Sequence, residues 1–409
     1  MRKFVIIAMM ALVAVIETGG FAAAQQENCT GKLGIDWDAQ IAACTAAIKP
    51  VRSPGKDLAW AFANRGNAYF KKGQFDRAMQ DLDQAIKLDP NGAAAFNNRG
   101  NTYLGKADYD RAIQDYDQAI KLDPNSAATF NNRGNAYGRK LQYDRAIEDF
   151  DQAIKLDANY AIAFSGRGNA YYGKTQYNRA IKDLDQAISL DPDFAAAFDW
   201  RGNAYDDKGQ HDRAIQDYDQ AIKLDPSLAL AFNDRGLAHY RKAEYDRALE
   251  DLDQAIKLDP KLARAFDNRG ATYDDKGQHD RAMQDLNHAI ELDPKFAEAF
   301  NDRCWSRTIV AQQLDQALKD CNESLRLRPN NADTFDTRAF TYFKLAQYDN
   351  AMADYDTALK LDPKIATSLY GRGLVKQKKG DATGGDTDLA AAKAIDPKIA
   401  DKLAGYGVK

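Results

Sequence analysis

Apolar residues fall at helical spacing in two consecutive stripes between Trp60 and Pro90. The first stripe carries Phe62, Gly66 and Tyr69 on one face, and a glycine interrupts it. The second stripe consists of Ala78, Met79, Leu82, Ala85 and Ile86. Pro90 ends it, because proline cannot continue a helix. The pattern predicts a hairpin of two helices, each of about 14 residues, a length that is only marginally stable alone.

This hairpin recurs with a period of 34 residues. A glycine follows an arginine in seven successive copies: Gly66, Gly100, Gly134, Gly168, Gly202, Gly236 and Gly270. The same position continues as Cys304 and then, after one inserted residue, as Ala339 and Gly373. A fixed period of this size predicts a solenoid in which each copy is stabilised by packing on its neighbours.

Small residues explain how the two helices of a copy approach each other. We expect Gly66 to face Ala78 and Ala85 across the hairpin, with larger side chains filling the space beside them. A leucine in place of Gly134 should force the hairpin apart, at a cost of about 1–3 kcal/mol.

These positions resemble the tetratricopeptide repeat, a helix–turn–helix unit of 34 residues. The resemblance extends over Ala59–Ile399 and includes ten repeats. The repeats depart from the family pattern at Ala158, His239, Arg307, Lys376 and Gly385 and at the insertion near TIVAQQ. The resemblance implies an all-α fold, a right-handed α-solenoid of about ten helix–turn–helix repeats, whose first helices line a concave groove.

All ten repeats carry an arginine before the glycine position, from Arg65 to Arg372. An aspartate stands on the second helix of every repeat, from Asp81 to Asp388. We hypothesise that each pair forms a partly buried, charge-assisted bridge between the two helices. The alternative is two independent surface charges multiplied by duplication.

The four cysteines favour disulfides in an exported chain. Cys304 and Cys321 take facing positions in the eighth repeat, and Cys44 aligns with Cys321. We predict Cys29–Cys44 and Cys304–Cys321, each closing a short loop worth about 3 kcal/mol. A four-cysteine metal site is disfavoured, because the pairs lie far apart and lack C-x-x-C spacing.

The chain begins with two basic residues, an apolar run from Phe4 to Ile16, and an A-x-A arrangement ending at Ala24. This pattern predicts a signal peptide over residues 1–24. A membrane anchor is the alternative, but the run is shorter than the roughly 20 residues that cross a bilayer. We expect a disulfide-linked cap and linker at 25–58, ten repeats at 59–399, and a tail at 400–409. Export to the periplasm fits best, with secretion as a second possibility.

Composition and motifs point away from several classes of function. A formal net charge of −4 argues against sequence-independent binding of nucleic acid. No motif suggests a catalytic constellation or a phosphate loop, so we expect neither catalysis nor a cofactor. The phrase DDKGQHD, which occurs twice, is the one candidate for a divalent cation. It lacks the spacing of a calcium loop, and duplication explains it, so we expect no metal.

The groove implied by the resemblance would carry two kinds of polar residue. Amides suit the backbone of an extended peptide. The asparagines expected there are Asn64, Asn67, Asn98, Asn101, Asn132, Asn135, Asn169 and Asn203. Later repeats place acids among aromatic side chains, which is typical of an interface hot spot. These residues are Trp200, Asp206, Asp207, Asp234, Tyr240, Asp267, Asp274, Asp275, Asp302 and Trp305.

The sequence therefore predicts a non-enzymatic scaffold or adaptor that binds a protein, or a peptide segment that is extended or basic. It predicts no stable membrane anchor, and it leaves the oligomeric state open. Two alternatives remain: a secreted effector that acts on another cell's proteins, and a binder of carbohydrate or metal that uses the groove.

Overall fold

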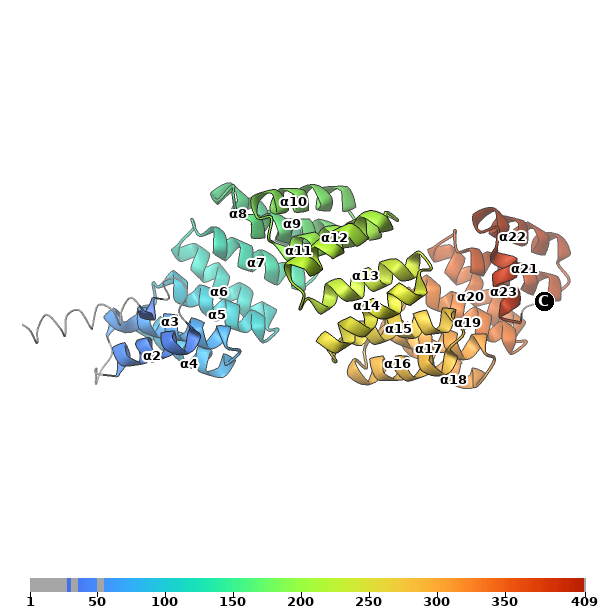
Figure 1. Ribbon diagram of the computed structural model, residues 1–409, viewed down its shortest axis with the longest axis horizontal. Helices are drawn as coiled ribbons and strands as arrows, with labels where there is room; N and C mark the ends of the chain where they lie inside the picture. Colours follow the sequence, from blue (N-terminus) through green and yellow to red (C-terminus); the bar gives the residue numbers. More distant parts are fainter. Residues whose placement is uncertain (1–27, 31–35, 50–54, 408–409) are drawn as a thin grey trace, which may run out of the picture. The chain divides into compact units, whose positions relative to one another are not determined.

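The computed structural model describes residues 28–30, 36–49 and 55–407, and these residues form helices and turns without a strand (Figure 1). The chain divides into two compact units, Met1–Lys208 and Gly209–Lys409. The division falls in the turn of the fifth repeat. The predicted all-α solenoid is confirmed. The predicted signal peptide lies outside the described residues.

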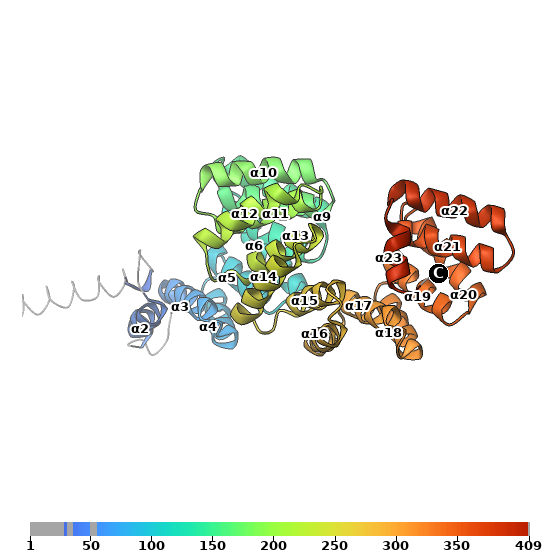
Figure 2. The same ribbon diagram turned by 45° about the vertical axis from the view of Figure 1, so that its right-hand side comes forward.

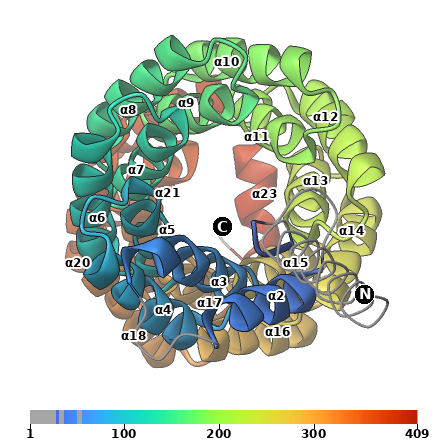
Figure 3. The same cartoon turned by 90° about the vertical axis from the view of Figure 1, so that its left-hand side faces the viewer.

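The N-terminal unit begins with α2 (Trp37–Ile48) and the short 3-10 helix η1 (Lys56–Leu58). Its first helices are α3 (Ala59–Lys71), α5 (Ala93–Gly105), α7 (Ala127–Arg139), α9 (Ala161–Gly173) and α11 (Ala195–Asp206). Its second helices are α4 (Phe75–Leu88), α6 (Tyr109–Leu122), α8 (Tyr143–Leu156) and α10 (Tyr177–Leu190). Successive first helices contact one another, and Figure 3 shows α5, α7 and α9 on the inner side of α6, α8 and α10.

The C-terminal unit opens with α12 (His211–Leu224), the second helix of the fifth repeat. Its first helices are α13 (Ala229–Arg241), α15 (Ala263–Asp275), α17 (Ala297–Ile309), α19 (Ala332–Lys344) and α21 (Ala366–Lys378). Its other second helices are α14 (Tyr245–Leu258), α16 (His279–Leu292), α18 (Leu314–Leu327), α20 (Tyr348–Leu361) and α22 (Ala382–Ile395). One further helix, α23 (Ile399–Gly405), includes much of the segment expected to be a tail.

The two helices of a repeat approach each other closely at the glycine position. A Cβ atom on Gly134 would lie 2.9 Å from Phe150 Cε1 and 3.2 Å from the Ala146 carbonyl oxygen. Ala146 is fully buried and Phe150 almost so. Close packing therefore excludes a side chain at this point of α7, as the sequence predicted.

The hypothesised bridges between arginine and aspartate are present. Each guanidinium donates from Nε and Nη2 to both oxygens of one carboxylate, an arrangement that is stronger than a single contact. The pairs are Arg65–Asp81, Arg99–Asp115, Arg133–Asp149, Arg167–Asp183, Arg235–Asp251, Arg269–Asp285, Arg303–Asp320, Arg338–Asp354 and Arg372–Asp388. The aspartates are only 6–10% exposed, which makes these bridges largely buried.

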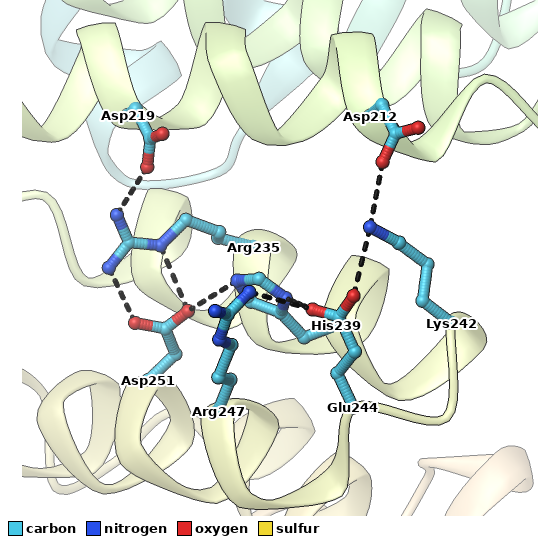
Figure 4. A network of polar contacts seen from close by, with 8 residues as sticks. All are labelled: Asp212, Asp219, Arg235, His239, Lys242, Glu244, Arg247 and Asp251. Carbon is cyan, nitrogen blue, oxygen red and sulfur yellow. Dashed lines mark hydrogen bonds and ion pairs between the residues drawn. The ribbon is translucent and has the colours of Figure 1, made fainter.

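The same arginines also join one repeat to the repeat before it. In Figure 4, Arg235 holds Asp251 of its own repeat, while its Nη1 donates to Asp219 Oδ1 on α12 at 2.6 Å. Corresponding contacts of 2.5–2.9 Å reach Asp83, Asp117, Asp151, Asp185, Asp253, Asn287, Asn322 and Asp356. Each of these arginines is thus a link between neighbouring repeats.

A helix and a disulfide cap the start of the array. Cys29 and Cys44 are joined, as are Cys304 and Cys321, so both predicted pairings are confirmed. Arg65 Nη1 donates to Thr45 Oγ1 on α2 at 3.0 Å, the contact that an acid or amide of the preceding repeat makes elsewhere. Helix α2 therefore substitutes for the second helix of a preceding repeat.

Gly134→Leu should lower the free energy of unfolding by about 1–3 kcal/mol, because the new side chain overlaps Phe150. Gly138 lies on the same helix, and a Cβ atom added there would have no atom within 4 Å, so Gly138→Leu is the matched control. We expect Gly138→Leu to be neutral or mildly stabilising, since glycine is unfavourable inside a helix. Urea denaturation followed by circular dichroism measures both, and equal effects would contradict this account of the packing.

Asp285→Asn should destabilise the C-terminal unit by about 3 kcal/mol, since it leaves a largely buried guanidinium without its main partner. Asp253→Asn removes the other carboxylate on Arg269, and that group is 58% exposed. We expect Asp253→Asn to cost under about 1 kcal/mol. Denaturation midpoints compare the two variants, and the reverse order would show that the exposed contact is the stronger one.

Candidate functional site

Amide groups connect successive first helices on the inner side of the N-terminal unit. Asn132 Nδ2 donates to Asn97 Oδ1 at 3.1 Å, across a spacing of 35 residues. Asn101 instead accepts from the Tyr116 hydroxyl at 2.7 Å, so its amide oxygen serves contact within the repeat. The other predicted asparagines are all partly buried: Asn64, Asn67, Asn98, Asn135, Asn169 and Asn203.

Aromatic residues lie on later first helices of the same unit. The ring of Trp200 lies 6.0 Å from that of Tyr172, and the Tyr172 hydroxyl donates to Asp207 Oδ2 at 2.7 Å. Asp207 is exposed, whereas Asp206 is only 5% exposed. The structure therefore separates two neighbouring acids that the sequence placed in one group.

The C-terminal unit repeats the amide contact and then changes its chemistry. Asn268 Nδ2 donates to Asn233 Oδ1 at 3.0 Å, again 35 residues apart, and Asn233 Nδ2 donates to Asp234 Oδ1. One repeat later the same two positions are Asp267 and Asp302, which are both carboxyl groups. The position of a hydrogen-bonded amide pair is thus occupied by two acids, which we call the inner carboxyl pair.

The inner carboxyl pair lacks a balancing positive charge among its described contacts. Asp267 is 5% exposed, and its Oδ1 has no hydrogen-bond partner in the structure. Asp302 is partly buried and accepts from Asn301 Nδ2 at 3.1 Å. The described surroundings of the pair therefore contrast with those of the bridging aspartates on the second helices, each of which binds an arginine.

Burial and neighbouring acids both disfavour the ionised forms of the pair. Burial raises the pKa of Asp267, and the charges of Asp302 and Glu298 raise it further. Burial raises the pKa of Asp302 to about 7, with Asp274 and Glu298 among the acids that add to it and the Asn301 amide opposing it. A group with such a pKa is partly protonated near neutral pH.

The ninth repeat places another acid at the position that Asp267 takes in the seventh. Asp336 accepts from Ser368 Oγ at 2.5 Å and from Thr367 Oγ1 at 2.6 Å, both on α21. Burial raises the pKa of Asp336 to about 6, while these two hydroxyls lower it. Neutral donors therefore satisfy this carboxyl group, in contrast to Asp267 Oδ1.

The other predicted acids of the C-terminal unit lie at the end of α15. Asp274 is 6% exposed, and its Oδ1 contacts His279 Nδ1 at 2.8 Å and the Ser306 hydroxyl at 3.1 Å. Asp275 is exposed and affects Tyr240, whose pKa is raised by burial and then by this carboxylate. Because both Ser306 and His279 bind Asp274, their arrangement differs from a Ser-His-Asp relay, in which the histidine stands in the middle.

Trp305 packs against a segment of the chain that the sequence analysis did not predict to lie near it. Its ring lies 5.7 Å from Phe340 and 5.3 Å from Tyr406, which follows α23. Lys344 Nζ donates to the Tyr406 carbonyl oxygen. Sequence reasoning missed this contact, because no periodic signal connects residues after the last repeat to the eighth.

The described part of the chain contains no group of three or more histidine, cysteine or acidic residues placed to hold a metal ion. Within the same residues, no helix has the length and apolarity needed to cross a membrane.

Comparison with family models accounts for most of this repeated architecture. Models described as TPR repeat or tetratricopeptide repeat match residues 66–106, 93–126, 127–160, 169–208, 202–243, 229–262, 263–296 and 341–380. The chain belongs to the tetratricopeptide repeat family. Arrays of this family generally serve as scaffolds for protein interaction, and the repeats of this chain support that general role.

Two solved structures with TM-scores of 0.58 show the same fold. The Cut9–Hcn1 hetero-tetramer of APC/C is 16% identical, with a TM-score of 0.58, and the match covers 83% of this chain and 80% of that one. Human IFIT1, solved as a dimer with m7Gppp-AAAA, is also 16% identical with a TM-score of 0.58, over 92% and 95% of the two chains. MamA is 32% identical over 40% of this chain and 96% of that one, with a TM-score of 0.35. The comparison with curated proteins found no match.

Asp302→Asn tests the electrostatic character of the inner carboxyl pair in this tetratricopeptide array. The folded pKa values of Asp267 and Asp302 lie above the ordinary value of 3.8, so the folded state binds more protons than the unfolded state. The free energy of unfolding should therefore fall as the pH rises from about 4 to about 7. Asp302→Asn should weaken that fall and stabilise the protein at pH 8 by about 1–3 kcal/mol.

Thermal denaturation at pH 5 and pH 8 measures this effect. Asp253→Asn, an exposed substitution on α14, is the control and should leave the pH dependence unchanged. An equal pH dependence in wild type and Asp302→Asn would show that the pair is not strained by charge.

Proposed function

We propose that the chain is an exported, non-enzymatic scaffold that binds an extended protein segment along the first helices. In this proposal, a basic side chain of the partner binds opposite Asp267 and Asp302. The observation that supports it most directly is the inner carboxyl pair, in which a buried carboxylate oxygen has no hydrogen-bond partner. A guanidinium or ammonium group from a partner would supply both the missing donor and the missing charge.

The bridges between arginine and aspartate illustrate how a cation stabilises a buried carboxylate in this fold. In each bridge, a guanidinium group of the first helix binds both oxygens of a carboxylate on the second helix. These carboxylates are at most 10% exposed. Removing one partner of such a pair is costly, because a buried charge is left uncompensated. The inner pair resembles that half-complete state, so binding of a basic residue should be favourable.

The amide row suits the rest of an extended segment. Asparagine side chains both donate and accept, and peptide backbone offers the same groups. In the proposal, Asn98 and Asn132 of the N-terminal unit contact partner backbone, and Trp200 is an apolar anchor of that unit. In the C-terminal unit, Asn268 contacts backbone and Tyr240 is the anchor. Asp207, Asp234 and Asp275 provide further negative charge at the more accessible positions.

Export rests on two independent supports. The first residues have the pattern of a signal peptide, and two disulfides close short loops, which is typical of oxidising compartments. We propose the bacterial periplasm as the location. Cell fractionation distinguishes it from secretion into the medium.

The inner double variant Asp267→Asn/Asp302→Asn should weaken binding of a labelled peptide of alternating arginine and alanine by at least about tenfold at pH 8. The dependence of Kd on salt concentration should flatten at the same time, because fewer charges are paired in the complex. Fluorescence anisotropy between about 50 and about 300 mM salt, a range over which screening changes strongly, measures both quantities.

The matched control removes two carboxylates from elsewhere in the same unit, through Asp253→Asn/Asp280→Asn. These positions are exposed, and the variant has the same net charge as the inner double variant. If both double variants weaken binding equally, the attraction is general and the assignment of the inner face is wrong. Crosslinking in the periplasm followed by mass spectrometry, with the same variants, then identifies the natural partner.

A further inference from the structure

The last helix of the chain contacts both helices of the tenth repeat, α21 and α22. Figure 2 shows α23 beside α21 and α19. Ile399 is 1% exposed and Leu403 is 4% exposed, and both belong to one apolar cluster with Phe340, Leu359 and Leu369. Helices α19, α20 and α21 therefore contribute to an apolar seat that is filled by the chain itself.

Helix α23 depends on this seat for its own structure. It has only seven residues, and isolated helices of that length are unstable in water. Its buried residues stand four positions apart on one face, whereas Asp401, Lys402 and Ala404 are exposed. This is the pattern of a short amphipathic ligand bound in a groove, with two aliphatic anchors.

A third anchor follows the helix. The Tyr406 ring meets Trp305 of α17 edge to face, with ring centres 5.3 Å apart, and Lys344 of α19 donates to the Tyr406 carbonyl oxygen. Burial raises the pKa of the Tyr406 hydroxyl to about 12, and the charges of Asp275 and Asp274 add to this effect. The segment thus extends from the last repeat to the eighth repeat and packs on Trp305, one of the residues expected to bind a partner.

We propose that Ile399–Tyr406 is an internal ligand of the inner face, and that a partner segment with the same spacing of anchors displaces it. The spacing is aliphatic, three residues, aliphatic, two residues, aromatic. This inference rests on the proposed function, and it adds both a regulatory step and a second chemical requirement for the partner. A short tether gives such an internal ligand an effective concentration in the millimolar range, so an external segment must either bind more tightly or await local release of α23.

The test uses the full chain and a labelled synthetic peptide with the sequence of residues 397–409. Leu403→Asp places a charge in the apolar seat from the side of the internal ligand and should release it. Ala404→Asp adds the same charge on the exposed face and is the matched control. We expect the Leu403→Asp protein to bind the peptide at least about tenfold more tightly than wild type or the Ala404→Asp protein, as measured by fluorescence anisotropy.

A second variant and a folding control accompany this measurement. Tyr406→Ala in the protein should also increase peptide binding, while the same change in the peptide should abolish it. Circular dichroism establishes that the repeats stay folded, and if Leu403→Asp unfolds them, Tyr406→Ala alone provides the comparison. Equal binding by wild type and the released variant, or no binding by either, overturns the proposal.

The result is separable from that of the proposed function. Introducing Asp267→Asn/Asp302→Asn into the Leu403→Asp protein should leave binding of the 397–409 peptide within about twofold, because its anchors bind elsewhere. The same double change should abolish tight binding of the arginine–alanine peptide. Loss of 397–409 peptide binding in this variant would contradict the internal ligand, whereas retention of tight arginine–alanine binding would contradict the proposed function.

Discussion

One guanidinium per repeat holds most of this structure together. The arginine that precedes the glycine position binds both oxygens of an aspartate in its own hairpin and also reaches the second helix of the preceding repeat. It stacks over a phenylalanine one helical turn earlier as well, as Arg269 does over Phe266 at 5.5 Å. Because hairpins of this length are marginal alone, a contact that fastens both the hairpin and its neighbour couples the stability of adjacent repeats.

Charge is balanced very differently on the two sides of the first helices. On the side of the second helices, guanidinium groups compensate the buried carboxylates. On the inner side, amides bind amides in two places, and then Asp267 and Asp302 take the same positions without such compensation. In the proposed function, this difference in charge compensation is what makes the inner side the binding surface. Apolar anchors from α23 cover a neighbouring part of that surface, so charge and hydrophobic contact are separated along it.

The repeat, the bridges and the disulfides were all predictable from the sequence. The second contact of each arginine was missed, although a signal for it exists. An acid or amide stands two residues after the bridging aspartate in the first nine repeats, from Asp83 to Asp356, but Ala390 takes its place in the last repeat. An acid there would have no following arginine to bind.

The predicted acidic group was also mixed in character, because Asp206 and Asp274 are buried while Asp207 and Asp275 are exposed.

Periodic contacts can be predicted from the sequence, because residues at one position of a repeat meet corresponding partners in successive repeats. Hairpin packing and the bridges within a repeat are of this kind, and local spacing determines them. The inner carboxyl pair and the seat of α23 are different, because neither lies within a single repeat. Asp267 and Asp302 belong to different repeats, and only the stacking angle of the helices brings their positions together. Tyr406 follows the last repeat altogether, so its contact with Trp305 depends on how the first helices curve and on the apolar surface they leave for Ile399 and Leu403 to cover.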